Sequence, residues 1–111
     1  MSESEDLLAG QASLLEATLA LLHLAREESW DRLLEAMPAQ RAAFARLQAS
    51  GVGGLDASTQ DSLKRLIEQT EAANEELVTR LLAWQNEVST ILQEIDMTRA
   101  NGKKISRAYG A

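Results

Sequence analysis

Residues 6–26 carry the apolar pattern of one face of an amphipathic helix. Leucine doublets recur every seven residues, and the apolar positions between them step by four and three: Leu8, Ala12, Leu15, Leu19 and Leu22. This spacing predicts a helix from about residue 6 to residue 26. Ser13 and Glu16 form an S-x-x-E capping box, so we expect the firm part of this helix to begin near Ser13.

A second stripe of the same period lies in residues 29–48 and predicts a second helix. Its positions are Trp30, Leu33, Leu34, Met37, Arg41, Phe44 and Leu47. Pro38 has no backbone N–H and predicts a kink just before it. No glycine or proline separates the two stripes, so periodicity leaves open whether the chain turns near Arg26–Ser29 or continues as one helix.

The third stripe is the longest. It follows residues 49–57, which hold three of the six glycines and form the clearest loop in the chain. Ser58 and Asp61 then form a capping box, which predicts that a helix opens there and runs from 58 to 100. Its heptad positions are Leu63, Ile67, Thr70, Asn74, Leu77, Leu81, Trp84, Val88, Ile91, Ile95 and Thr98. Such a helix spans roughly 65 Å, about twice the length of either earlier segment. The first two helices can therefore pack against only part of its apolar stripe, and something else must cover the rest.

The chain after residue 100 differs in composition from the body. Asn101–Gly102 predicts the end of the third helix, and residues 103–109 form a short C-terminal segment. The last thirteen residues carry a charge of +4, whereas the preceding 98 carry −10. The segment's apolar residues lie on one side of a two-turn helix: Ile105, Ala108 and Tyr109.

Composition supports one all-helical domain. Leucine and alanine supply 36 of the 111 residues, and aromatic residues only 4%. With no cysteine and one histidine, disulfides, thiol chemistry and multi-histidine metal sites are excluded. The carboxylates lie opposite the apolar stripes, so we expect no enzyme, no catalytic residue, no cofactor and no metal. A net charge of −6 argues against direct binding to nucleic acid or to an anionic membrane.

The N-terminus and hydropathy predict a cytoplasmic protein. The first six residues include Glu3, Glu5 and Asp6, where a signal peptide needs positive charge. The most apolar stretch, Leu19–Ala25, is shorter than a membrane span and contains His23.

An apolar surface on the third helix is the main candidate for function. We expect a partner to bind at Leu77, Leu81, Trp84, Val88, Ile91 and Ile95, although the same positions are typical of bundle core. Ile105, Ala108 and Tyr109 are the candidate cover, because a short apolar and basic segment can fold back onto an acidic body.

The chain resembles the FliT-type flagellar export chaperones over nearly its whole length. Residues 22–33 read L-H-L-A-R-E-E-S-W-D-R-L, similar to the family's L-A-x-E-E-x-W-D-x-L at the junction of its first two helices. The family, like this chain, has a long third helix after a variable loop. Residues 104–110 read K-I-S-R-A-Y-G, similar to the family's closing A-Y-G.

The resemblance implies a turn near Arg26–Ser29, and hence an antiparallel three-helix bundle with a long third helix and a short C-terminal fourth helix. It also implies a cytoplasmic chaperone of type III secretion in bacterial flagellum biogenesis, which holds the C-terminal region of the filament-cap protein FliD. In the family the C-terminal helix partly covers the binding surface. Some members also bind the export ATPase machinery or restrain the master flagellar transcription activator.

The alternative is a structural coiled-coil protein. Residues 6–48 would form one long helix antiparallel to residues 58–100, and two such hairpins would pair as a dimeric four-helix bundle. The chaperone interpretation predicts a monomer or weak homodimer, and the coiled coil predicts an obligate dimer.

Overall fold

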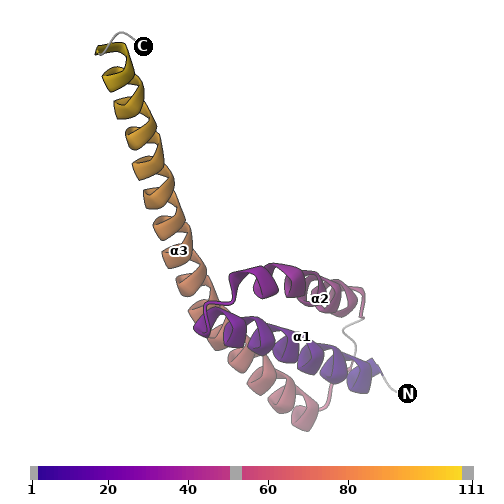
Figure 1. The fold of residues 1–111 in the computed structure, drawn as a ribbon. Helices are drawn as coiled ribbons and strands as arrows, with labels where there is room; N and C mark the ends of the chain where they lie inside the picture. The colour runs from indigo at the N-terminus through magenta and orange to yellow at the C-terminus, as the bar shows by residue number, and fades with distance from the viewer. Residues whose placement is uncertain (1–2, 51–53, 109–111) are drawn as a thin grey trace. The chain divides into compact units, whose positions relative to one another are not determined.

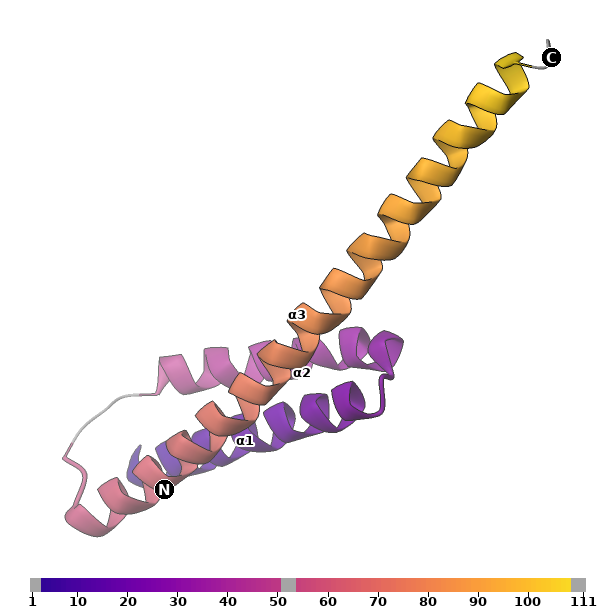
Figure 2. The same ribbon diagram turned by 90° about the vertical axis from the view of Figure 1, so that its left-hand side faces the viewer.

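The computed structural model describes residues 3–50 and 54–108 (Figures 1 and 2). Three helices make up this part of the chain: α1 (Glu3–Arg26), α2 (Trp30–Ala49) and α3 (Ala57–Ala108). No strand occurs within the described ranges, so the predicted all-α class is confirmed. The predicted fourth helix is wrong, because the described residues contain three helices and α3 itself extends to Ala108.

The chain continues from α1 to α2 through a tight turn at Glu27–Ser29. The Glu28 N–H donates to the Ala25 carbonyl at 3.0 Å, and the Ser29 N–H donates to the Leu24 carbonyl at 2.9 Å. This is the Schellman pattern, which requires a left-handed residue, and Glu28 supplies it with φ of 58°. The continuous helix over residues 6–48, on which the coiled-coil alternative depended, is therefore wrong.

The start of α3 is capped two residues earlier than the sequence predicted. Asp56 Oδ1 accepts a hydrogen bond from the Thr59 N–H at 2.7 Å, so Asp56, and not Ser58, caps the helix. Hydrogen bonds from the Thr59 side chain and backbone hold the pKa of Asp56 below its usual value. At the other end α3 passes through Asn101–Gly102, because glycine lowers helix stability by only about 1 kcal/mol and does not force a stop.

The described chain divides into two compact units, Met1–Arg80 and Leu81–Ala111, where the sequence predicts a single domain. The N-terminal unit contains α1, α2 and the first half of α3, with α1 between the other two (Figure 1). Its core is mostly leucine and alanine: Leu7, Leu14, Leu21, Leu22, Ala25, Leu33, Ala43, Ala73 and Leu77. The C-terminal unit contains the second half of α3.

The buried face of α1 overlaps the predicted apolar face but is shifted toward the first leucine of each doublet. Its buried positions step by four and three through Leu7, Gln11, Leu14, Thr18, Leu21 and Ala25, and Leu22 is buried beside them. Leu19, expected on the buried face, is 48% exposed. This register buries two polar side chains, which is tolerated because both make hydrogen bonds (below). The helix also runs unbroken from Glu3, so Ser13 does not begin it.

Candidate partner-binding surfaces

The six predicted binding positions fall into three groups by exposure. Leu77 is buried in the core of the N-terminal unit, with 3% of its surface exposed. Leu81 and Trp84 are half-buried. Val88, Ile91 and Ile95 are exposed, at 37%, 54% and 42%. Leu77 therefore serves the core, and the other five positions remain available for a partner.

The exposed apolar surface of α3 includes a residue that heptad counting missed. Leu92 is 56% exposed and shares a side of the helix with Val88, four residues before it, and Ile95, three residues after it. We define the α3 stripe as Leu81, Trp84, Val88, Ile91, Leu92 and Ile95. Glu87 and Glu94 flank it on one side, and Asp96, four residues after Leu92, flanks it on the other. The stripe is therefore a contiguous apolar strip with an acidic border.

The candidate cover lies at the end of the chain. Ile105 and Ala108 belong to α3, and Tyr109 lies outside the described residues. A fold-back at Asn101–Gly102 is not what the structure has, since the helix is continuous there.

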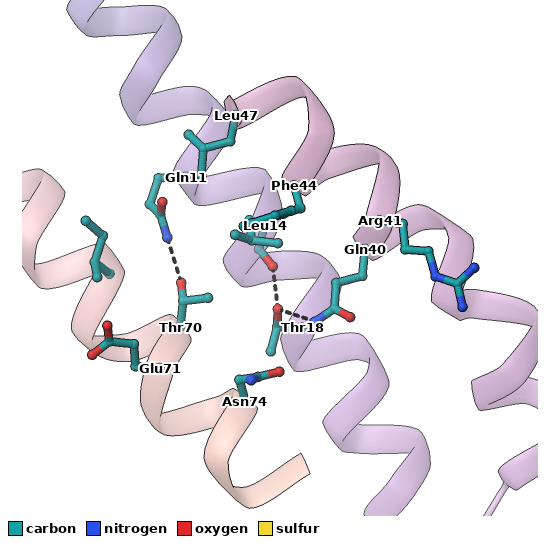
Figure 3. A pocket seen from close by; sticks show the side chains of 11 residues that line it. Gln11, Leu14, Thr18, Gln40, Arg41, Phe44, Leu47, Thr70, Glu71 and Asn74 are labelled. Carbon is teal, nitrogen blue, oxygen red and sulfur yellow. Dashed lines mark hydrogen bonds between the residues drawn. The ribbon is translucent and has the colours of Figure 1, made fainter. Parts of the chain in front are cut away.

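A groove in the N-terminal unit is a second apolar surface, which the sequence did not predict (Figure 3). Its volume is about 550 Å³. Residues of α1 form its floor, and α2 and α3 form its two walls. The lining residues are Gln11, Leu14, Thr18, Gln40, Arg41, Phe44, Leu47, Ile67, Thr70, Glu71 and Asn74.

The groove's polar residues occupy positions where the apolar stripes are interrupted. Arg41 stands in the stripe of α2, and Thr70 and Asn74 stand in the stripe of α3. Phe44 and Ile67 are 49% and 37% exposed at the same place. Polar residues at stripe positions were thus the signal that α2 and α3 do not close against each other here.

Hydrogen bonds at the groove floor join the three helices (Figure 3). Gln11 Nε2 donates to Thr70 Oγ1 at 3.1 Å, which links α1 to α3. Gln40 Nε2 donates to Thr18 Oγ1 at 3.0 Å, which links α2 to α1. The Thr18 hydroxyl donates in turn to the Leu14 carbonyl at 2.8 Å. Among the described residues no buried side-chain nitrogen or oxygen lacks a partner, so the floor is polar but satisfied.

An ion-pair cluster joins the end of α1 to α3 within the same unit. Arg26 donates two hydrogen bonds to Glu76, at 2.7 and 2.8 Å, and Arg80 Nε donates to Glu76 Oε2 at 2.8 Å. The hydrogen bonds from Arg26 and then Arg80 lower the pKa of Glu76 to about 2. The hydrogen bond with Glu76, and next the attraction of its negative charge, raises the pKa of Arg26. These side chains are exposed, so the cluster orients the helices more than it stabilises them.

The described residues hold no group of three or more histidine, cysteine, aspartate or glutamate side chains able to bind a metal ion. His23 Nε2 lies 3.0 Å from Glu27 Oε1, one helical turn away at the exposed end of α1.

By length and apolar composition, residues 4–26 of α1 could cross a membrane, although the sequence expectation considered only the shorter stretch 19–25. Core helices of soluble proteins and signal sequences have the same composition.

Comparison with known proteins adds no relative. The chain matches no model of a known protein family, no curated protein and no solved structure.

Proposed function

We propose that the chain is a cytoplasmic export chaperone of the flagellar type III system, whose client is the C-terminal region of the filament-cap protein FliD. The observation that supports this most is the α3 stripe, where four aliphatic residues at helical spacing are exposed: Val88, Ile91, Leu92 and Ile95. The resemblance of residues 22–33 and 104–110 to FliT-type chaperones supplies the identity of the client.

An amphipathic helix is the client element that fits the stripe. Residues at i, i+3, i+4 and i+7 present one row of apolar side chains, which pairs with a similar row on a second helix. Fully burying each aliphatic side chain gains about 1.5–3 kcal/mol. These four side chains are 37–56% exposed in the free chain, so covering them contributes a few kcal/mol. The conformational entropy that the client loses on binding reduces this gain.

The flanking charges set the expected client chemistry. Glu87 and Glu94 border the stripe, so a client helix with lysine or arginine beside its apolar row is favoured. Components of the export ATPase or a flagellar transcription activator would use the same stripe, and would therefore compete with FliD. The N-terminal unit then acts as the folded support for α3, and the function is binding rather than catalysis.

Trp84 allows a direct test, because it lies within the stripe, whereas Trp30 lies in α2. In a Trp30→Phe variant, titration with a peptide from the C-terminus of the same organism's FliD should shift the tryptophan emission. The matched control is Trp84→Phe, which retains Trp30 and should show no shift. An unchanged Trp84 signal at saturating peptide, or an equal shift in the control, would rule out binding at the stripe.

A further inference from the structure

We propose that a hollow on one edge of the α3 stripe anchors the client helix. The hollow takes one large apolar side chain of the client, and a lysine or arginine of the client pairs with Asp96 beside it. The inference rests on the proposed function, which it deepens by naming the part of the stripe that selects the client and the side chains that it selects.

The hollow lies on α3 within the C-terminal unit. Its volume is about 260 Å³, and its lining residues are Trp84, Gln85, Val88, Ser89 and Leu92. The last four stand at i, i+3, i+4 and i+7 of the helix. Four residues at this spacing form the hole that receives one side chain of a facing helix in knobs-into-holes packing. The hollow therefore fits a single side chain that projects from a second helix.

The lining of the hollow favours an apolar occupant. Ser89 has the smallest side chain of the five, and it leaves space between the larger side chains around it. Val88 and Leu92 are 37% and 56% exposed, so an occupant that covers both removes apolar surface from water. A charged side chain would lose its hydration against these two residues. The anchoring residue of the client is therefore a large apolar one.

The hollow is displaced from the middle of the stripe toward Asp96. Ser89, Leu92 and Asp96 follow one another by three and four residues, so they lie along one edge of α3. Glu87 and Glu94 lie along the opposite edge. A client helix whose side chain fills the hollow therefore lies closer to Asp96 than to Glu94.

Charge selects a basic flank on the client. Residues 81–98 contain three charged residues, and all are acidic: Glu87, Glu94 and Asp96. A lysine or arginine on the flank of the client next to the hollow is attracted to Asp96, whereas an acidic residue there is repelled. Asp96 lies about two turns from the middle of the hollow, and lysine and arginine side chains are long. We therefore expect the basic residue one to two turns from the anchoring residue.

Filling the hollow tests the anchor. Ser89→Leu adds an aliphatic side chain to the wall of the hollow, and leucine favours a helix more than serine does, so α3 should be retained. Calorimetric titration with the FliD C-terminal peptide should show at least a tenfold loss of affinity. Thr90→Leu is the matched control, because Thr90 is exposed and projects from the far side of the helix, two residues after Val88. Its affinity should be unchanged, and circular dichroism verifies that both variants keep their helix content.

Alanine scanning of the peptide identifies the anchoring residue. Replacing one large apolar residue of the peptide by alanine should weaken binding to the unaltered chain at least tenfold. The same replacement should cost little with the Ser89→Leu variant, because the anchoring side chain is already excluded from the hollow. Equal costs with both chains at every position of the peptide would overturn the inference.

Charge reversal tests the placement of the client. Asp96→Lys should lower affinity about two- to fivefold, as expected for an exposed ion pair, and by more than Glu94→Lys does. Replacing the basic residue of the peptide by glutamate should restore part of this loss with the Asp96→Lys variant. An equal or larger loss for Glu94→Lys would overturn the placement toward Asp96.

Two further comparisons distinguish failure of this inference from failure of the proposed function. If the FliD peptide binds, Ile91→Asp weakens it and Ser89→Leu does not, the hollow is not the anchor and the chaperone function stands. If the FliD peptide does not bind, a model helical peptide with one row of leucines flanked by lysines replaces it. Binding of the model peptide that Ser89→Leu weakens and Thr90→Leu does not would support the hollow and reject FliD as the client. Binding of neither peptide would overturn both.

Discussion

Leu33 and Leu34 are neighbours in α2 with opposite surroundings, and they give the sharpest test of the fold. Leu33 is fully buried, with 0% of its surface exposed, whereas Leu34 is 51% exposed. The sequence treats them as an equivalent doublet in one stripe. Replacing each by alanine deletes the same atoms from the same helix, so any difference in stability reports burial alone.

The expected difference follows from the burial. Leu33→Ala removes a fully packed side chain and leaves a cavity, which costs about 2–5 kcal/mol. Leu34 has about half of its surface already in water, so Leu34→Ala costs about 1 kcal/mol at most. For a unit of this size each 1 kcal/mol lowers the Tm by about 4–8 °C, so Leu33→Ala should lower it by about 10 °C or more.

Urea unfolding followed by the fluorescence of Trp30, in a Trp84→Phe background, measures both variants within the N-terminal unit. The midpoint should fall strongly for Leu33→Ala and slightly for Leu34→Ala, with the same dependence on urea. Equal losses, or a larger loss for Leu34→Ala, would refute the register of α2 against α1.

Three further predictions concern single contacts. Thr18→Val keeps the shape of a fully buried side chain but removes the acceptor for Gln40, so the free energy of unfolding should fall by about 1–2 kcal/mol in urea. Glu28→Gly relieves the left-handed φ of 58° at the α1–α2 turn, and should raise stability by about 1 kcal/mol; a loss would argue against the Schellman turn. The Glu76 pKa lies near 2 instead of the ordinary 4.5, so the stability that its carboxylate gives is complete above pH 4.5 and is lost as the pH falls toward 2. Thermal melts of Glu76→Gln should therefore show a shallower decline than the unaltered chain over that range, and parallel curves would contradict the ion pair.

The helices were predictable because their apolar residues repeat at helical spacing, but which part of each apolar face is buried was not. In α1 the leucine doublets offer two adjacent faces of similar hydrophobicity. The structure buries the one that includes Gln11 and Thr18, since Thr70 and Gln40 satisfy them. Hydrogen bonds between distant helices leave no trace in the spacing of a single helix.

The helix bounds agree with the predicted ones to within three residues except at the end of α3, although some local signals at the ends were absent or misleading. The α1–α2 turn has Glu28 where glycine is commonest, so composition gave no sign of it. Asn101–Gly102 has the residues of a typical helix end, yet α3 continues through it to Ala108. At the candidate site, the apolar run on α3 was predictable from spacing. The groove was not, because it depends on how α2 and α3 diverge.

Calorimetric titration of the FliD C-terminal peptide into the full chain tests the proposed client surface most directly. The chain should bind the peptide, Ile91→Asp should weaken binding by about tenfold or more, and Met97→Asp should bind as the unaltered chain does. Ile91 and Met97 are exposed apolar positions of the same helix, at 54% and 66%, and Met97 lies outside the stripe, so the comparison isolates the stripe. Absence of binding to the full chain, or equal affinity for the Ile91→Asp variant, would contradict a client site on α3.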